Sequence, residues 1–219
     1  MRFDILTIFP QLFSSFAEES LVKCAREKNK LSLEVHDLRS WTTDAHKTVD
    51  DKPFGGGLGM VMKVEPIHGA IKDLKRKGGK VVLFSPRGKR FTQSMAQEFS
   101  RQSQLILVCG RYEGVDERVA KHLADYIVSL GPFVLMGGEI PAMAIIEATS
   151  RLIPGVVGKA DFLKEHIPAT GGFIEYPQYT RPEEYSPESG TVWKIPKVLI
   201  SGDHKKIGEW RKKKGKTLR

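Results

Sequence analysis

Apolar and polar residues alternate along several short segments, and between them apolar residues recur at helical spacing. The alternation begins at the N-terminus, where a half-buried strand is expected to end at Pro10. The pattern predicts strands over residues 2–9, 31–36, 80–84, 105–109 and 126–128. It predicts helices over residues 18–29, 65–77, 92–102, with Thr92 as N-cap, and 115–124. Strands that alternate with helices indicate an α/β fold, a mostly parallel sheet with helices on both faces.

Residues 129–155 form the stretch around which this fold is expected to be built. Phe133–Met136 is a short apolar run, Gly137 and Gly138 follow it, and an almost wholly apolar segment begins after Glu139. This order predicts a strand, a tight glycine turn and a buried helix with Pro141 in its first turn.

The alternation of strand and helix patterns is lost in two places, a long internal segment and the C-terminal part of the chain. Residues 39–62 are polar and glycine-rich, and loops of that length are usually functional or mobile. Residues 159–172 are aperiodic, and prolines punctuate the segments that follow. We therefore expect one domain over residues 1–158, a linker or lid over 159–172, and a small, mostly helical domain over 173–219.

The positive charge of the chain is unevenly distributed along the sequence. The net charge of +9 is concentrated in residues 205–219, where eight basic residues and one acid give +7 and leave +2 for the rest. A cationic tail suits a polyanionic partner such as a nucleic acid. No apolar run is long enough to span a membrane and no signal peptide is evident, so a cytoplasmic protein is expected. Cys24 and Cys109 lack metal-ligand spacing and are interpreted as buried thiols.

Three turns are expected to meet at the carboxyl edge of the sheet, where open α/β sheets bind ligands. They are Ser85-Pro86, Gly110–Gly114 and Leu135–Gly138. Neither a P-loop nor a GxGxxG fingerprint is present, and acids follow Gly110. Because carboxylates repel a pyrophosphate, the residues favour a nucleoside without phosphates.

Five segments, in order along nearly the whole chain, resemble the bacterial tRNA (guanine-N1)-methyltransferase family. They are Asp50–Met62, Cys109–Val119, Ser129–Gly158, Pro177–Pro182 and Ser201–Arg211. The resemblance implies S-adenosylmethionine as methyl donor, the SPOUT fold with a C-terminal trefoil knot around the cofactor, and an obligate homodimer with its active site across the interface. It also implies that tRNA is methylated on the guanosine immediately 3′ of the anticodon. It allows magnesium, although no residue cluster indicates a metal site.

By matching position, the resemblance implies that the cofactor residues are Ser85, Pro86, Gly110, Tyr112, Glu113, Leu130, Gly131, Phe133, Leu135, Gly137 and Gly138. It places the tRNA contacts on Asp50, Gly57, Gly59, Arg181, Ser201, Gly202, His204 and Arg211. Trp193 and Trp210 are interpreted as core of the small domain rather than as platforms for bases.

Methyl transfer to guanine N1 requires a base for the N1 proton and a cation for the charge that develops on O6. Arg151 matches the arginine that the family places near O6. The family's Asp-Ser-Phe tripeptide, which carries its proposed base, is absent. Glu165 is the favoured replacement, Asp161 is the second candidate, and His166 is a third.

Two other classes of protein stay open. A non-catalytic RNA-binding protein of the same fold is the main alternative, because the tripeptide is missing. A nucleotide-dependent oxidoreductase is disfavoured, because the chain has no phosphate-binding glycine fingerprint.

Overall fold

The computed structural model describes residues 1–157, 173–188 and 190–218. The chain divides into two compact units, Met1–Ala160 and Asp161–Arg219. The predicted linker 159–172 lies outside the described residues, and with it the candidate bases Asp161, Glu165 and His166.

The first unit is built on one five-stranded sheet in which every pairing is parallel. In spatial order its strands are β2 (Ser32–Asp37), β1 (Arg2–Thr7), β6 (Gln104–Val108), β5 (Lys80–Arg90) and β7 (Tyr126–Ser129). A separate two-residue pair, β3 (Asp50–Asp51) with β4 (Val61–Met62), closes the base of the long glycine-rich loop. The α/β class and the mostly parallel sheet are therefore confirmed.

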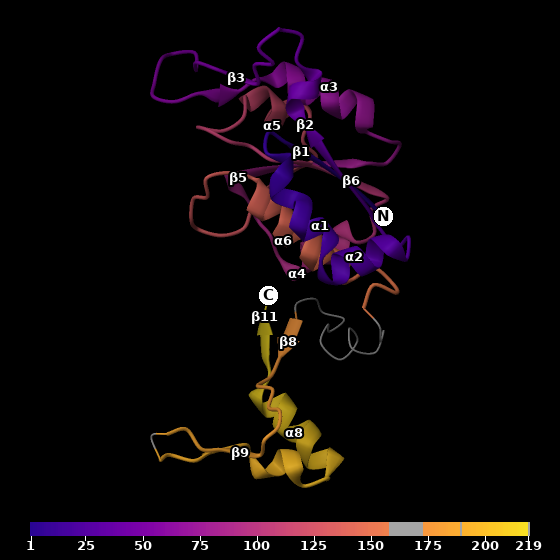
Figure 1. The fold of residues 1–219 in the computed structure, drawn as a ribbon, viewed down its shortest axis with the longest axis vertical. Helices are drawn as coiled ribbons and strands as arrows, with labels where there is room; N and C mark the ends of the chain where they lie inside the picture. Colours follow the sequence, from indigo (N-terminus) through magenta and orange to yellow (C-terminus); the bar gives the residue numbers. More distant parts are fainter. Residues whose placement is uncertain (158–172, 189, 219) are drawn as a thin grey trace. The chain divides into compact units, whose positions relative to one another are not determined.

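Helices cover both faces of this sheet, as Figure 1 shows. One face carries α1 (Ser14–Glu18), α2 (Ser20–Glu27), α4 (Gln93–Phe99) and α6 (Glu139–Ser150). The other face carries α3 (Val64–Leu74) and α5 (Glu117–His122), together with the 3-10 helix η2 (Leu38–Trp41). Another 3-10 helix, η1 (Pro10–Phe13), follows β1. Each face encloses its own apolar core, because alternate residues of a strand point to opposite sides.

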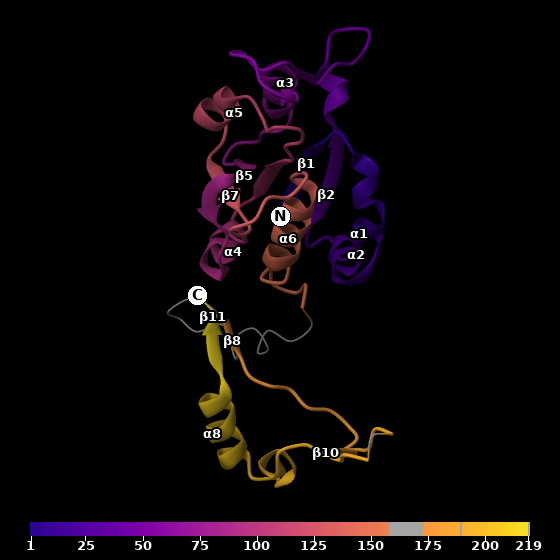
Figure 2. The same ribbon diagram turned by 90° about the vertical axis from the view of Figure 1, so that its left-hand side faces the viewer.

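Helix α6 lies at the centre of its layer, between α2 and α4 in Figure 2. Ala142, Ile145 and Ile146 are fully buried, and Pro141 occupies the first turn, as the sequence predicts. The predicted N-cap is also confirmed, since the Thr92 hydroxyl accepts a hydrogen bond from the Met95 N–H at the start of α4. None of the described helices combines the length and hydropathy that a bilayer crossing requires.

Several predicted elements differ in the structure. Phe133–Met136 is not a strand but an irregular, exposed segment. The strand predicted to stop before Ser85 continues as β5 to Arg90, with an irregularity between Phe84 and Lys89. Helix α4 ends three residues earlier than predicted, at Phe99. Cys109 is buried as expected, but Cys24 is exposed on α2.

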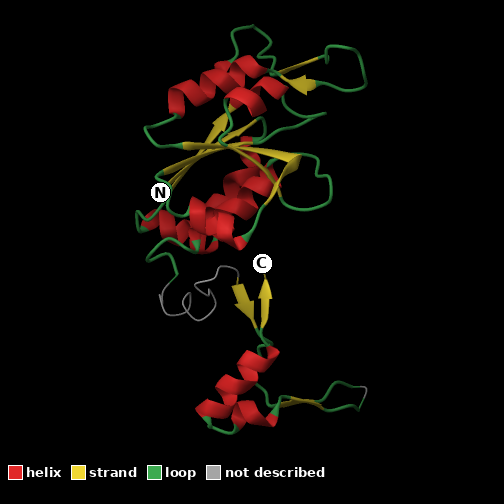
Figure 3. Ribbon diagram, turned by 180° about the vertical axis from the view of Figure 1, so that it is seen from behind, coloured by secondary structure: helices red, strands yellow, loops and turns green. Residues whose placement is uncertain are grey.

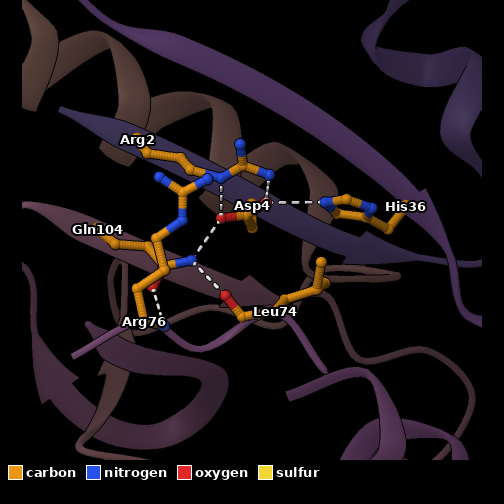
Figure 4. A network of polar contacts seen from close by, with 6 residues as sticks. All are labelled: Arg2, Asp4, His36, Leu74, Arg76 and Gln104. Atoms are coloured by element: carbon orange, nitrogen blue, oxygen red, sulfur yellow. Dashed lines mark hydrogen bonds and ion pairs between the residues drawn. The ribbon is translucent and has the colours of Figure 1, made fainter. Parts of the chain in front are cut away.

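A buried carboxylate ties the strands of the sheet together (Figure 4). Asp4 on β1 is fully buried and accepts hydrogen bonds from Arg2, at 2.6 and 2.7 Å, and from the Gln104 amide at 2.7 Å. The His36 ring nitrogen lies 2.8 Å from the same carboxylate. Burial alone would raise the pKa of Asp4, but the hydrogen bonds from His36, Arg2 and Gln104 outweigh it and hold the pKa well below its usual range.

The described part of the second unit contains one α-helix, α8 (His204–Lys214), and one 3-10 helix, η3 (Lys197–Ile200). Two short antiparallel pairs accompany them, β8 (Phe173–Glu175) with β11 (Lys216–Leu218) and β9 (Glu184–Tyr185) with β10 (Trp193–Lys194). Figure 3 shows the helices in red and the strands in yellow. The small domain therefore mixes helix and strand, and Trp193, predicted in its core, is 61% exposed.

Candidate active site

Three segments of the first unit enclose a cavity of about 220 Å³. They are the irregular part of β5, the turn after β6, and the segment that leads from β7 into α6. Of the eleven predicted cofactor residues, ten line this cavity: Ser85, Pro86, Gly110, Tyr112, Glu113, Leu130, Phe133, Leu135, Gly137 and Gly138. Gly131 does not line it; this residue is buried against the Phe133 ring, and a Cβ there would come within 2.5 Å of a ring carbon.

The walls of the cavity are mainly main chain and apolar side chains. Val134 and Met136 line it as well, although both are largely exposed. Among the described main-chain hydrogen bonds, none is donated by an N–H group of residues 133–137. This segment therefore offers free main-chain donors beside an apolar surface, which is the composition of a site for an aromatic heterocycle.

Gly137 and Gly138 allow unusually close approach of two of these segments, the turn after β6 and the start of α6. A Cβ on Gly138 would lie 2.6 Å from the Cα of Cys109, and the Gly138 N–H donates to the Gly110 carbonyl at 2.9 Å. A Cβ on Gly137 would lie 2.3 Å from the Arg111 side chain. The pair of glycines, Gly137 and Gly138, is thus explained by its packing against the turn after β6.

The sequence did not identify Arg111 and Glu139 as partners, and their ion pair holds two of the turns together. The Arg111 Nε donates to Glu139 at 2.9 Å, and the Thr7 hydroxyl donates to the other carboxylate oxygen at 2.8 Å. The Arg111 guanidinium also lies 4.6 Å from the centre of the Phe9 ring. The sequence does carry a signal for this pair. Arg111 and Glu139 have opposite charges, and each lies beside one of the two glycine turns that are predicted to meet.

Because Glu139 is only 1% exposed, Arg111 and Thr7 rather than water compensate its carboxylate. Arg111 lines the cavity, but its charge is already balanced by Glu139. Among the cavity-lining residues it is the one arginine or lysine, and Glu113 adds a carboxylate. The cavity therefore offers a bound molecule little net positive charge.

The glycine-rich loop between β3 and β4 packs against the turn that follows β6. The Glu113 N–H donates to the Met60 carbonyl at 3.0 Å, and a Cβ on Gly59 would lie 2.6 Å from Glu113 Cγ. Burial, and then the nearby Asp50 carboxylate, raise the pKa of the Tyr112 hydroxyl. The structure thus brings Asp50 and Gly59, predicted to contact tRNA, next to the turn after β6, and Gly57 lies in the same loop.

Arg151 lies at the far end of α6 from the cavity. Gly138 precedes the helix and Arg151 caps its C-terminus, so the helix separates them by about 20 Å. Within one chain, the structure does not bring Arg151 to the cavity wall.

The remaining predicted tRNA residues belong to the second unit. Ser201, Gly202 and His204 surround the start of α8, where the Asp203 carboxylate accepts from the N–H groups of Lys205 and Lys206 at 3.1 Å each. Arg211 lies further along the helix, 5.0 Å from the centre of the Tyr176 ring. Arg181 is exposed. Among the described residues, no three His, Cys, Asp or Glu side chains gather as metal ligands do.

Comparison with known proteins extends over almost the whole chain. The model of the family described as "tRNA (Guanine-1)-methyltransferase TrmD" matches residues 1–218. A tRNA (guanine-N(1)-)-methyltransferase of Geobacter sp. (strain M21) is 50% identical over 215 residues, which are 97% of this chain and 84% of that protein. Proteins of the same name are 48% identical over 213 residues in Dictyoglomus turgidum (97% and 84%) and 49% identical over 216 residues in Clostridium beijerinckii (98% and 87%). On these matches, the chain belongs to the tRNA (guanine-1)-methyltransferase family.

Proposed function

We propose that this protein methylates tRNA, transferring a methyl group from S-adenosylmethionine to N1 of the guanosine immediately 3′ of the anticodon. Family membership makes it a tRNA (guanine-N1)-methyltransferase and hence an enzyme. The observation that carries the proposal is the cavity between the three turns, with free main-chain donors, apolar walls and one arginine already neutralised by Glu139. We place the reaction in the cytoplasm because its substrate is tRNA.

The residues present fit S-adenosylmethionine, whose adenosine carries no phosphate. The apolar side chains of Phe133 and Leu135 suit the faces of an adenine ring, and the N–H groups of residues 133–137 suit its polar edge. Glu113 is placed to accept hydrogen bonds from ribose hydroxyls or to face a sulfonium charge. When bound, the cofactor supplies an electrophilic methyl group.

The chain's own residues must manage one proton and one developing charge. Guanine N1 carries a proton at neutral pH, which a general base within hydrogen-bond reach must accept. We assign this role to Glu165, with Asp161 and His166 as the alternatives. As N1 loses its proton, negative charge develops on O6, and we assign its stabilisation to the Arg151 guanidinium.

We further propose a homodimer with the active site across its interface, and a trefoil knot formed by the segments around the cavity. The family supports both features. The distance along α6 between Arg151 and the cavity supports a site assembled from two chains.

Methyl transfer to an unmodified tRNA transcript, followed by mapping of the methylated nucleotide, tests the proposal. We expect label from S-adenosylmethionine on N1 of the guanosine 3′ of the anticodon, and none on a transcript with adenosine there. RNA binding without label transfer would instead support the non-catalytic alternative. Magnesium dependence is read from the same reaction with and without a chelator.

A further inference from the structure

A second cavity, of about 300 Å³, lies within the second unit between residues 176–179 and helix α8. Its walls are Tyr176, Pro177, Gln178, Tyr179, Leu199, His204, Ile207, Gly208, Trp210 and Arg211. This volume is large enough to admit a single planar ring system.

Aromatic rings dominate one side of this cavity. The rings of Tyr179 and Trp210 lie 6.3 Å apart at an angle of 60°. Tyr179 is 49% exposed, so its ring does not serve only as core. The rings of a second pair, Tyr185 and Trp193, lie 5.6 Å apart, but neither residue lines the cavity. The unit therefore contains one aromatic pair that lines the cavity and a second pair outside it, which serves as a control for substitutions.

Basic side chains line this cavity or follow it along α8. His204 and Arg211 line it, and α8 carries Lys205, Lys206 and a run of basic residues from Arg211 to Lys214. Asp203 already accepts from the first free N–H groups of the helix, so anion binding there falls to side chains rather than to the helix terminus. An aromatic cavity with basic side chains at its edge matches the chemistry of one unstacked nucleotide.

We propose that this cavity holds one unpaired base of the bound tRNA, stacked against Tyr179 and Trp210, while the basic residues of α8 contact the adjoining phosphates. The proposal rests on tRNA being the substrate and names an additional contact for it. It also revises the sequence-based interpretation of Trp210, whose side chain is half-buried and lines the cavity.

Stacking and phosphate contact leave different signatures in the salt dependence of binding. The affinity of the full-length protein for unmodified tRNA is measured without cofactor at several salt concentrations. We expect Tyr179→Ala to weaken binding about 5- to 100-fold at every salt concentration, with an unchanged slope. Lys212→Ala should instead reduce the slope of log K against log salt by somewhat less than one. Tyr179→Phe and the control Trp193→Ala should bind like the wild type.

The base is identified by repeating the measurement with transcripts that are abasic at one loop position each. One such position should weaken binding to the wild type and have no further effect on Tyr179→Ala. Wild-type affinity of Tyr179→Ala, or losses that add at every abasic position, would overturn the proposal. Normal methylation by the wild type in that case would leave the proposed function intact, whereas failure of the wild type to bind any tRNA would contradict the proposed function itself.

Discussion

Glu139 is the residue on which the geometry of the candidate site depends most. Its buried carboxylate accepts hydrogen bonds from the Thr7 hydroxyl and the Arg111 guanidinium. These bonds connect the end of β1 and the turn after β6 to the start of α6. Removing one partner of a buried ion pair leaves the other charge without compensation, which destabilises proteins more than loss of an exposed pair does.

Glu139→Gln should therefore lower the free energy of unfolding by about 3 kcal/mol, because a Gln amide cannot neutralise Arg111. The matched control is Glu117→Gln, which breaks the exposed pair with Arg87 near the same cavity and should change stability little. Urea unfolding of both variants checks this. Equal losses in the two variants would show that the Glu139 pair has no special role.

Asp4 predicts a specific pH dependence. Its pKa is lowered in the folded protein, so its stabilising contribution is fully present above the unfolded value of about 3.9 and is lost as pH falls towards the folded value. Asp4→Asn should lower the free energy of unfolding by about 2 kcal/mol at neutral pH. It should also flatten the decline in stability below about pH 4.

The control for this prediction is Glu34→Gln, which changes an exposed acid on the neighbouring strand β2. Urea unfolding between about pH 3 and 7 gives the slope for each protein. A slope in Asp4→Asn as steep as that of the wild type would assign the acid sensitivity to other carboxylates.

At the scale of elements, the segment from β7 to α6 explains both a failure and a success of the sequence-based prediction. A run of four apolar residues, Phe133–Met136, fits a buried strand, but hydropathy does not distinguish burial in a sheet from exposure to a ligand. The helix after it was predicted because its apolar residues cover every side, which a buried helix requires.

Strand β5 shows a similar limit. Pro86 indicates a strand end, since proline cannot donate to a sheet ladder. In the structure Pro86 falls inside the irregularity between Phe84 and Lys89, where the ladder with β7 is interrupted, so the strand resumes beyond it. The strand therefore extends to Arg90 because it pairs again with β7 at Val128, a tertiary contact that the local sequence does not encode.

Gly88 makes this irregularity possible. A Cβ there would lie 2.6 Å from the Val128 nitrogen, so Gly88→Ala should force β5 away from β7, next to the cavity. We expect a loss of about 2 kcal/mol in stability and weaker binding of S-adenosylmethionine. Lys89→Ala, at an exposed position of the same strand, is the control. Thermal unfolding with and without the cofactor measures both effects, and wild-type behaviour of Gly88→Ala would refute the tight contact.

At the scale of the whole molecule, the meeting of the three turns was predictable, because the ends of parallel strands share one edge of a sheet. The cavity beside α8 was not predictable, since the proline-rich residues 176–182 have no periodicity that fixes which side chains face the helix. The contact of Asp50 with Tyr112 in the turn after β6 likewise depends on loop packing. The family comparison, rather than hydropathy, identified the substrate.

Assembly gives a further test of the proposed function. Arg151→Ala is combined in one heterodimer with whichever of Glu165→Ala and Asp161→Ala is inactive by itself. If each site takes Arg151 from one chain and the base from the other, one of the two sites is intact and about half the wild-type activity should return. Tandem purification of differently tagged chains isolates the heterodimer. Complete inactivity would mean that both groups come from the same chain.

The central claim is that the cavity between Pro86, Gly110 and Gly137 holds a sulfonium nucleoside that carries no phosphate. Calorimetric titration of the wild-type protein with S-adenosylmethionine and, separately, with ATP measures this preference. We expect saturable binding of S-adenosylmethionine, one molecule per chain, and no measurable binding of ATP. Equal or tighter binding of ATP, or no heat from S-adenosylmethionine, would contradict this claim.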